Sequence, residues 1–120
     1  MKRSTYIIGR ESECLAEAWY QGEGYQTVAR NFRGRGGEID LILRKGDELL
    51  VVEVKGRKDF CLEDAWQKRW RLKKKRIIRT LRYFLASSAG IGISWSEIRL
   101  EILFITQGRV KERFQEELFF

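Results

Sequence analysis

The chain of 120 residues contains no histidine, no proline and only two cysteines. The absence of histidine excludes nucleases and hydrolases whose general base or zinc ligands are imidazoles. The absence of proline excludes proline-rich linkers and polyproline ligands. Cys14 and Cys61 are too few and too far apart for a zinc knuckle or a disulfide framework. We therefore expect reduced thiols in a cytoplasmic protein.

Long apolar runs are also absent. No run approaches the roughly 20 residues that a membrane-spanning helix needs, and the apolar stretch at residues 6–8 is too short for a signal peptide. We therefore expect no membrane partner. A chain of 120 residues can bury one hydrophobic core but not two, so residues 1–120 are interpreted as a single domain.

Positive charge is abundant and unevenly distributed. The formal net charge is +7, and the sequence pI is near 9.7. One segment carries nine basic residues and no acid: Lys68, Arg69, Arg71, Lys73, Lys74, Lys75, Arg76, Arg79 and Arg82. Smaller groups are Arg30, Arg33 and Arg35, and Arg57 and Lys58. This pattern favours a polyanionic partner such as nucleic acid; the alternative is a basic face that is simply solvated.

Two segments on either side of Gly46-Asp47 show the alternation that is typical of β-strands. Residues 38–43 and 50–55 alternate apolar and other side chains with period two. A two-residue loop that contains glycine is a favoured connection between hairpin strands. The sequence therefore predicts a hairpin with Gly46-Asp47 as its loop.

The register set by this loop places Asp40 opposite Glu53 and Glu38 opposite Lys55. Opposed side chains in an antiparallel pair have Cβ atoms about 4.5–5.5 Å apart, and two carboxylates at that distance destabilise a sheet. A divalent cation removes the repulsion, because carboxylates are usual ligands of Mg²⁺. The pattern thus indicates a metal-dependent nuclease site. The alternatives are a half-exposed strand in which Glu53 and Lys55 face solvent, or a simple cross-strand ion pair of Glu38 with Lys55. At a metal site Glu38 is either a partner of Lys55 or an auxiliary ligand, and we expect the partner role.

The remaining segments predict further elements. We expect a helix at about 11–21, a strand at about 24–31, a flexible turn at 33–37, a long helix at about 63–87 and a strand at 98–105. Residues 109–120 are ambiguous. Trp66, Trp70 and Trp95 are candidates for stacking on bases, but we expect Trp66 to belong to the core.

Four stretches of the chain resemble one known family. They are residues 9–25, 29–42, 51–57 and 99–102, which read GRESECLAEAWYQGEGY, ARNFRGRGGEIDLI, VVEVKGR and RLEI. They resemble the YraN-like family of small bacterial proteins, which is similar to restriction endonucleases and archaeal Holliday-junction resolvases of the PD-(D/E)XK superfamily. The resemblance implies an α/β fold with a restriction-endonuclease-like core (αβββαβ), in which helices flank a mixed central sheet.

The resemblance also implies site residues by position. Asp40 matches the superfamily acid at the end of the second strand, and Glu53 and Lys55 match the acid-x-Lys pair. Glu13 matches the acid that resolvase-like members carry on their first helix. Ile39 precedes Asp40 where the superfamily has proline, in keeping with the family's own G-E-I-D pattern.

Two further departures leave the expected ligands in place. Ser12 stands where the family often has glycine. Residues 99–102 read RLEI where the family usually has RFDV, and we interpret this stretch as a packing strand.

The implied reaction is metal-assisted hydrolysis of DNA phosphodiester bonds with Mg²⁺ or Mn²⁺, including those of branched or structured DNA. Asp40, Glu53 and the Val54 carbonyl are the expected metal ligands, and Glu13 completes the shell directly or through water. Lys55, with a lowered pKa, is expected to orient water or phosphate. The expected nucleic-acid contacts are Arg33, Arg35, Arg57, Lys73, Lys74 and Arg76. Lys73 aligns with a lysine typical of the family's helix.

Two other classes of function fit the same sequence. A catalytically silent nucleic-acid-binding module of this fold would need no metal. A protein-interaction domain would use the basic face to bind an acidic partner. A junction-cutting enzyme is expected to act as a homodimer, although no segment identifies the interface.

Overall fold

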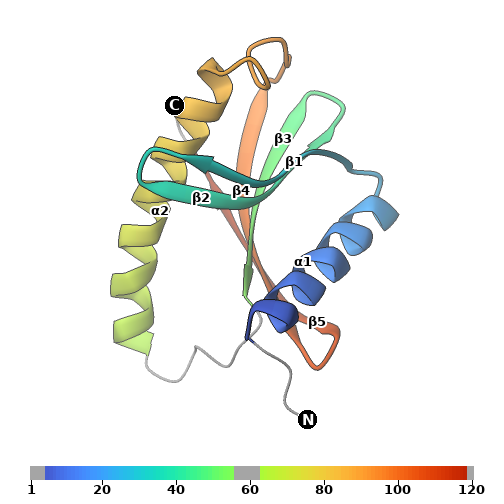
Figure 1. Cartoon of the computed structure of the whole chain (residues 1–120), viewed down its shortest axis with the longest axis vertical. Coiled ribbons are helices and arrows are strands. Elements are labelled where there is room, and N and C mark those ends of the chain that lie inside the picture. The colour runs from blue at the N-terminus through green and yellow to red at the C-terminus, as the bar shows by residue number, and fades with distance from the viewer. Residues whose placement is uncertain (1–4, 56–62, 119–120) are drawn as a thin grey trace.

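The computed structural model describes residues 5–55 and 63–118. Their elements, in chain order, are α1 (Thr5–Gly22), β1 (Gln26–Gly34), β2 (Gly37–Lys45), β3 (Glu48–Lys55), α2 (Glu63–Ala86), β4 (Glu97–Thr106) and β5 (Arg109–Glu117). The strands form one mixed sheet in the order β1-β2-β3-β4-β5 (Figure 1). Neighbouring strands are antiparallel except β3 and β4, which are parallel and are connected through α2.

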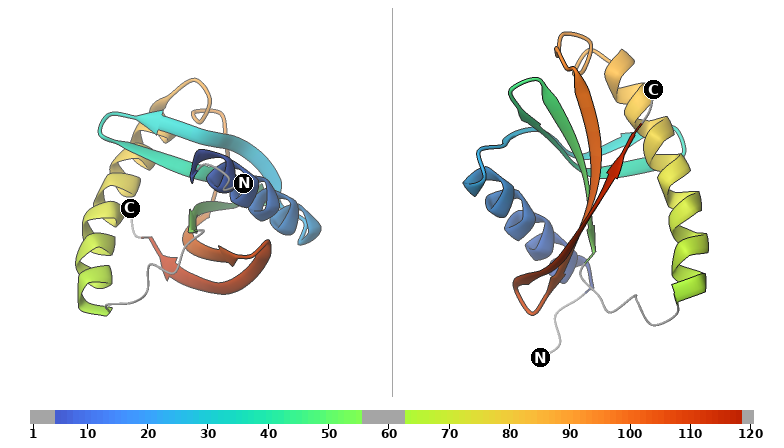
Figure 2. Two further views of the ribbon diagram at one scale, coloured as in Figure 1. Left: turned by 60° about the horizontal axis from the view of Figure 1, so that its bottom comes forward. Right: turned by 180° about the vertical axis from the view of Figure 1, so that it is seen from behind.

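The two helices cover opposite faces of this sheet (Figure 2). Val51 of β3 packs in the same cluster as Ile77 of α2, whereas Val52 packs with Tyr20 of α1. Because β3 is covered on both faces, its residues 49–52 are all apolar and fully buried. The implied α/β core with a mixed sheet between helices is therefore confirmed. None of the described helices is long and apolar enough to cross a membrane.

The hairpin of β2 and β3 has the predicted loop and register. Its loop is Gly46-Asp47, and the ladder runs from Lys45↔Glu48 to Leu41↔Val52. Gly46 has a φ of +60°. Glycine is favoured at such positions of hairpin turns, because residues with a Cβ atom adopt a positive φ only with steric strain.

The strands β1 and β2 extend further, and the loop between them is shorter, than the flexible turn predicted at 33–37. Gly34 and Gly37 pair with each other in the ladder, which leaves only Arg35-Gly36 as the loop. The glycines serve close packing as well as the turn. A Cβ atom on Gly37 would lie 2.5 Å from Thr80 Oγ1 of α2 and 3.1 Å from the Arg76 carbonyl oxygen.

Residues 109–117, which the sequence left unassigned, form the edge strand β5. Its side chains from Arg109 to Glu117 are mostly charged, so the apolar alternation that identifies a strand is weak. Antiparallel pairing with β4 supplies the order that the local pattern does not show.

We expect Gly37→Ala to destabilise the fold, because the added methyl group would push the β1–β2 hairpin away from α2. Overpacking of this kind costs about 1–3 kcal/mol, and denaturation by urea measures it. The matched control is Gly9→Ala in α1, where nothing lies within 4 Å of the new Cβ atom. That control should gain about 0.5–1 kcal/mol from helix propensity. Equal stabilities of the two variants would contradict the close contact.

Candidate metal centre and nucleic-acid interface

The candidate site lies where β2 separates from β3. Their ladder ends at Leu41↔Val52, while β3 continues beside β4 as far as Lys55↔Phe104. At the separation, the Val54 N–H donates a hydrogen bond to Asp40 Oδ2 at 2.8 Å. A side-chain oxygen of β2 therefore replaces a main-chain partner. The two strands form a fork, and Asp40 and Glu53 come from its two arms.

Asp40 is an acid that resists ionisation in this setting. Burial raises the pKa of its carboxyl group most, followed by the negative charge of Glu53, while the hydrogen bond from Val54 lowers it. Glu13 raises the same pKa and Lys73 lowers it, and the net value is about 8 against an ordinary value of 3.8. The predicted neighbourhood of two acids on adjacent strands is therefore present and is electrostatically unfavourable.

Glu53 is the more deeply buried acid, with only 3% of its surface exposed. A buried carboxylate requires a positive partner, because burial removes the water that would otherwise stabilise its charge. Two lysines supply that partner at the same oxygen. The Lys73 ammonium group, which α2 carries to the sheet, is in direct contact with Glu53 Oε1. Lys55 Nζ lies 3.6 Å from that atom.

Both lysines contact the same oxygen atom of Glu53, but their pKa values are shifted in opposite directions. Burial lowers the pKa of Lys55, and its hydrogen bond with Lys73 lowers it further, against the attraction of Glu53. Burial also lowers the pKa of Lys73, but Glu53 and the hydrogen bond to Lys55 outweigh it and raise the value overall. Of the two amines, Lys55 therefore loses its proton the more readily. The direction of this shift is the one expected for Lys55, and burial is its largest cause.

Glu13 lies near the fork on α1 without joining a three-acid cluster. It forms an ion pair with Arg10, with 3.9 Å between Arg10 Nη1 and Glu13 Oε2, and its charge reaches Asp40. Among the described side chains, no three of the types His, Cys, Asp and Glu lie close enough to hold one ion together. The role of Glu13 as a ligand remains a prediction.

The donor set at the fork fits a hard divalent cation. Two carboxylates lie at the fork, and Val54, whose N–H contacts Asp40, would add its carbonyl oxygen. Oxygen atoms of these types are the ligands that Mg²⁺ and Mn²⁺ prefer. The ammonium group of Lys73 already acts as a stand-in cation at Glu53. The unfavourable pairing of Asp40 with Glu53 would be relieved by positive charge between them.

The expected ion pair of Glu38 with Lys55 is wrong. Glu38 Oε2 instead lies 4.0 Å from Arg33 Nε on β1, and Lys55 lies beside Glu53. The prediction assumed that the β2–β3 register continues past Asp40. Because the strands separate there, residue 38 pairs with β1 alone.

The predicted nucleic-acid contacts fall into three groups. Arg33, Arg35 and Arg76 are exposed around the point where the β1–β2 hairpin meets α2. Lys73 belongs to the fork. Lys74 lies on another side of α2 and forms an ion pair with Glu116 of β5. Arg57 lies outside the described residues.

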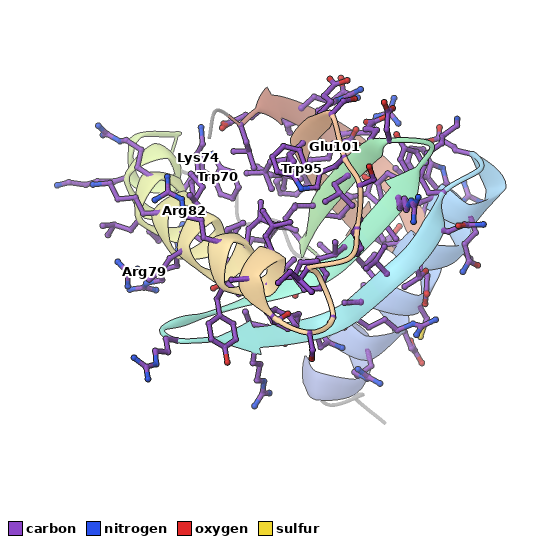
Figure 3. All side chains as sticks on the ribbon, turned by 90° about the horizontal axis from the view of Figure 1, so that it is seen from above. Trp70, Lys74, Arg79, Arg82, Trp95 and Glu101 are labelled. Carbon is purple, nitrogen blue, oxygen red and sulfur yellow. The ribbon has the colours of Figure 1, made fainter. Side chains whose placement is uncertain are left out.

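Trp70 is a core residue and not a stacking surface. It is buried, and its indole Nε1 donates to Glu116 Oε1 at 2.9 Å. Figure 3 shows Trp70 on the sheet side of α2. Trp95 is partly exposed, and the side chain of Trp66 is not among those described. Cys14 is a free, exposed thiol, and Cys61 lies outside the described residues.

A second buried acid, Glu101, was not identified from the sequence. Within the stretch interpreted as a packing strand, Glu101 is 1% exposed. It accepts hydrogen bonds from Tyr20 Oη at 2.8 Å and from Gln115 Nε2 at 2.9 Å. Arg99 Nη2 and Arg113 Nε lie 3.4 Å and 3.8 Å away. This network connects α1 to β4 and β5. The sequence signal for it was the position of an acid between two apolar residues of a predicted strand, Leu100 and Ile102.

An α/β sheet with this strand order, and with an acid and an acid-x-Lys pair at a strand fork, defines a domain consistent with the restriction-endonuclease-like core. The model of the family described as "Uncharacterised protein family UPF0102" matches residues 12–114. The chain belongs to this family.

Several relatives carry the same family description. A UPF0102 protein of Aeromonas hydrophila is 42% identical over 81 residues, which cover 68% of this chain and 62% of the relative. One of Halorhodospira halophila is 37% identical over 91% of this chain and 88% of the relative. UPF0102 protein YraN of Escherichia fergusonii is 33% identical over 90% of this chain and 82% of the relative. The chain thus spans about three fifths of the Aeromonas protein's length.

We expect Asp40→Asn to stabilise the metal-free protein near pH 8. Because the pKa of Asp40 is raised from 3.8 to about 8, the folded state binds more protons than the unfolded state between these values. The wild type therefore loses stability as the pH rises through this window. Asparagine carries no charge and can still accept the Val54 N–H. The expected gain is about 1 kcal/mol or more near pH 8 and shrinks towards pH 4, as measured by thermal unfolding with a chelator.

The matched control for this prediction is Glu97→Gln, because Glu97 is an exposed acid on β4. It should leave stability unchanged across the same pH range. A gain for Asp40→Asn that is the same at both ends of the window, or no gain at all, would show that ionisation of Asp40 does not oppose folding.

Proposed function

We propose that the protein is a divalent-metal-dependent DNA endonuclease that hydrolyses phosphodiester bonds, including those of branched or structured DNA. The observation that carries this proposal is the fork itself. It holds a buried Glu53, an Asp40 with a strongly raised pKa, and two lysines at one carboxylate oxygen. Perturbed titratable groups gathered at one point are typical of a catalytic site, since a purely structural strand end gains nothing from opposed acids.

The metal ligands would be Asp40, Glu53 and the Val54 carbonyl, with Glu13 acting directly or through water. A bound Mg²⁺ or Mn²⁺ ion would lower the pKa of a water molecule and offset the charge that develops on the phosphate. The Val54 N–H fixes the Asp40 carboxyl group in place. Placement on two strands of a buried sheet gives these oxygens a rigid support.

Lys55 is the proposed positioning group and proton acceptor. The pKa of Lys55 is lowered, most of all by burial, and after losing its proton Nζ would accept one from the attacking water. The water oxygen then forms a bond to phosphorus as the bond to the leaving oxygen breaks, and that oxygen takes a proton from solvent. Lys73 would contribute positive charge to the phosphate.

The exposed arginines around the β1–β2 hairpin and α2 would hold the DNA backbone. Arg33, Arg35 and Arg76 are supported by the contact of Gly37 with α2. Phosphate neutralisation by such residues gives sequence-independent affinity that falls with salt concentration.

The second candidate function is a catalytically silent nucleic-acid-binding module. The ion pair of Lys73 with Glu53 favours it, because this lysine already neutralises the buried acid without a metal. The raised pKa of Asp40 remains unexplained by this alternative.

We expect Mg²⁺- or Mn²⁺-dependent cleavage of labelled linear, flap or four-way-junction DNA. Asp40→Ala and Lys55→Ala should each lower the cleavage rate by about 10²-fold or more, as is typical for loss of one group that stabilises the transition state. Glu97→Gln is the control and should cut normally. No cutting by any form, with salt-sensitive binding retained in all, would establish the silent module.

We expect Arg33→Ala with Arg76→Ala to weaken DNA binding and to reduce its salt dependence. Each lost phosphate contact should lower the slope of log affinity against log salt by about one. Fluorescence anisotropy across a salt series measures both quantities. The control is Arg44→Ala, which removes an arginine at the other end of β2, where its side chain contacts Gly46. If the slope of log affinity against log salt were the same for the double variant and the wild type, DNA would not contact Arg33 and Arg76.

A further inference from the structure

Glu53 already has a cation in the position that a metal ion would need. Lys73 contacts Glu53 Oε1 directly, and Lys55 approaches the same atom at 3.6 Å. A Mg²⁺ ion lies about 2.0–2.1 Å from its oxygen ligands. An ammonium group in contact with that oxygen and a metal ion bound to it therefore compete for the same space and the same charge.

We propose that Lys73 is a built-in counter-ion, which holds Glu53 in the metal-free protein and is displaced towards the phosphate when a divalent cation binds. This inference rests on the proposed function, and it gives Lys73 two successive positions. The first is the observed ion pair. In the second, the ammonium group leaves the fork and joins the basic flank of α2.

The location of Lys73 on α2 permits this movement. Its side chain is 39% exposed, whereas that of Glu53 is only 4% exposed, so the lysine reaches the acid from the edge of the core. The unbranched lysine stem can turn outwards without moving the helix. Glu53 has no comparable freedom, because β3 is covered on both faces.

The residues that flank Lys73 explain where the released charge would go. Arg69 and Arg76 lie four residues before and three residues after it, so all three share one side of α2. Arg76 is exposed next to the β1–β2 hairpin. A displaced Lys73 would complete a basic row between them. Metal binding and phosphate binding would then favour each other, because each ligand stabilises the same displaced position.

Lys73→Met tests the competition, since methionine keeps an unbranched apolar stem and removes the charge. Titration calorimetry with MnCl₂ compares the wild type, Lys73→Met and the matched control Lys75→Met, which removes an exposed lysine from the same helix. We expect Lys73→Met to bind Mn²⁺ about tenfold tighter or more, because an ammonium ion no longer competes at close range. The control should match the wild type.

A second measurement uses the unmodified protein and does not depend on the folding of a variant. Brief acylation of lysine amines, read by peptide mass spectrometry, should label Lys73 more strongly with Mn²⁺ present than with a chelator. Labelling of Lys75 should stay constant. Unchanged labelling of Lys73 in a protein that binds Mn²⁺ would overturn the displacement.

The outcomes separate this inference from the proposed function. If the wild type binds Mn²⁺ and Lys73→Met binds it equally or more weakly, the built-in counter-ion is wrong while the metal site stands. If no form binds Mn²⁺, both the metal-dependent function and this inference are overturned.

Discussion

Burial of β3 on both faces is the constraint on which the site depends. Residues 49–52 of this strand are fully buried between α1 and α2. The strand then continues into Glu53, which carries charge to the edge of the same core. If Glu53 were exposed, water would stabilise its charge and it would need no partner. Buried, it requires positive charge at close range, and the two lysines at its Oε1 atom follow from that requirement.

The separation of β2 from β3 brings a second acid, Asp40, next to the buried Glu53. If the ladder continued, a main-chain group of β2 would serve the Val54 N–H. Instead the Asp40 carboxyl group accepts that hydrogen bond, which keeps it next to Glu53. The arrangement is unfavourable in the absence of a further cation, since the charge of Glu53 and burial both oppose the ionisation of Asp40. Stability given up at one point while the rest of the core is well packed is the pattern that functional sites show.

Local sequence signals predicted the part of the site that local structure determines. The Gly46-Asp47 loop and the alternation on its two sides were sufficient for the register that brings Asp40 towards Glu53. Extending this register beyond Asp40 predicted Lys55 as the partner of Glu38, whereas Glu38 lies near Arg33. The error arose because nothing in the local pattern marks where the strands separate. Glycines 34, 36 and 37 looked like a flexible turn, and their role in packing against α2 depends on a helix that follows much later in the chain.

The contacts of α2 could not be predicted, because they depend on how the helix is rotated against the sheet. Lys73 and Lys74 are adjacent in sequence, yet one reaches Glu53 of β3 and the other Glu116 of β5. Composition alone treats them as equivalent members of a basic run.

The rotation of α2 also places two of its basic residues in different surroundings. One turn of the helix carries Lys73 into the fork and Arg76 onto the exposed surface beside the β1–β2 hairpin. Because the two residues lie three positions apart on one helix, their main-chain positions are separated by only about 4.5 Å along its axis. Under the proposed function, a DNA backbone bound by Arg76 would therefore lie close to Glu53 and Asp40.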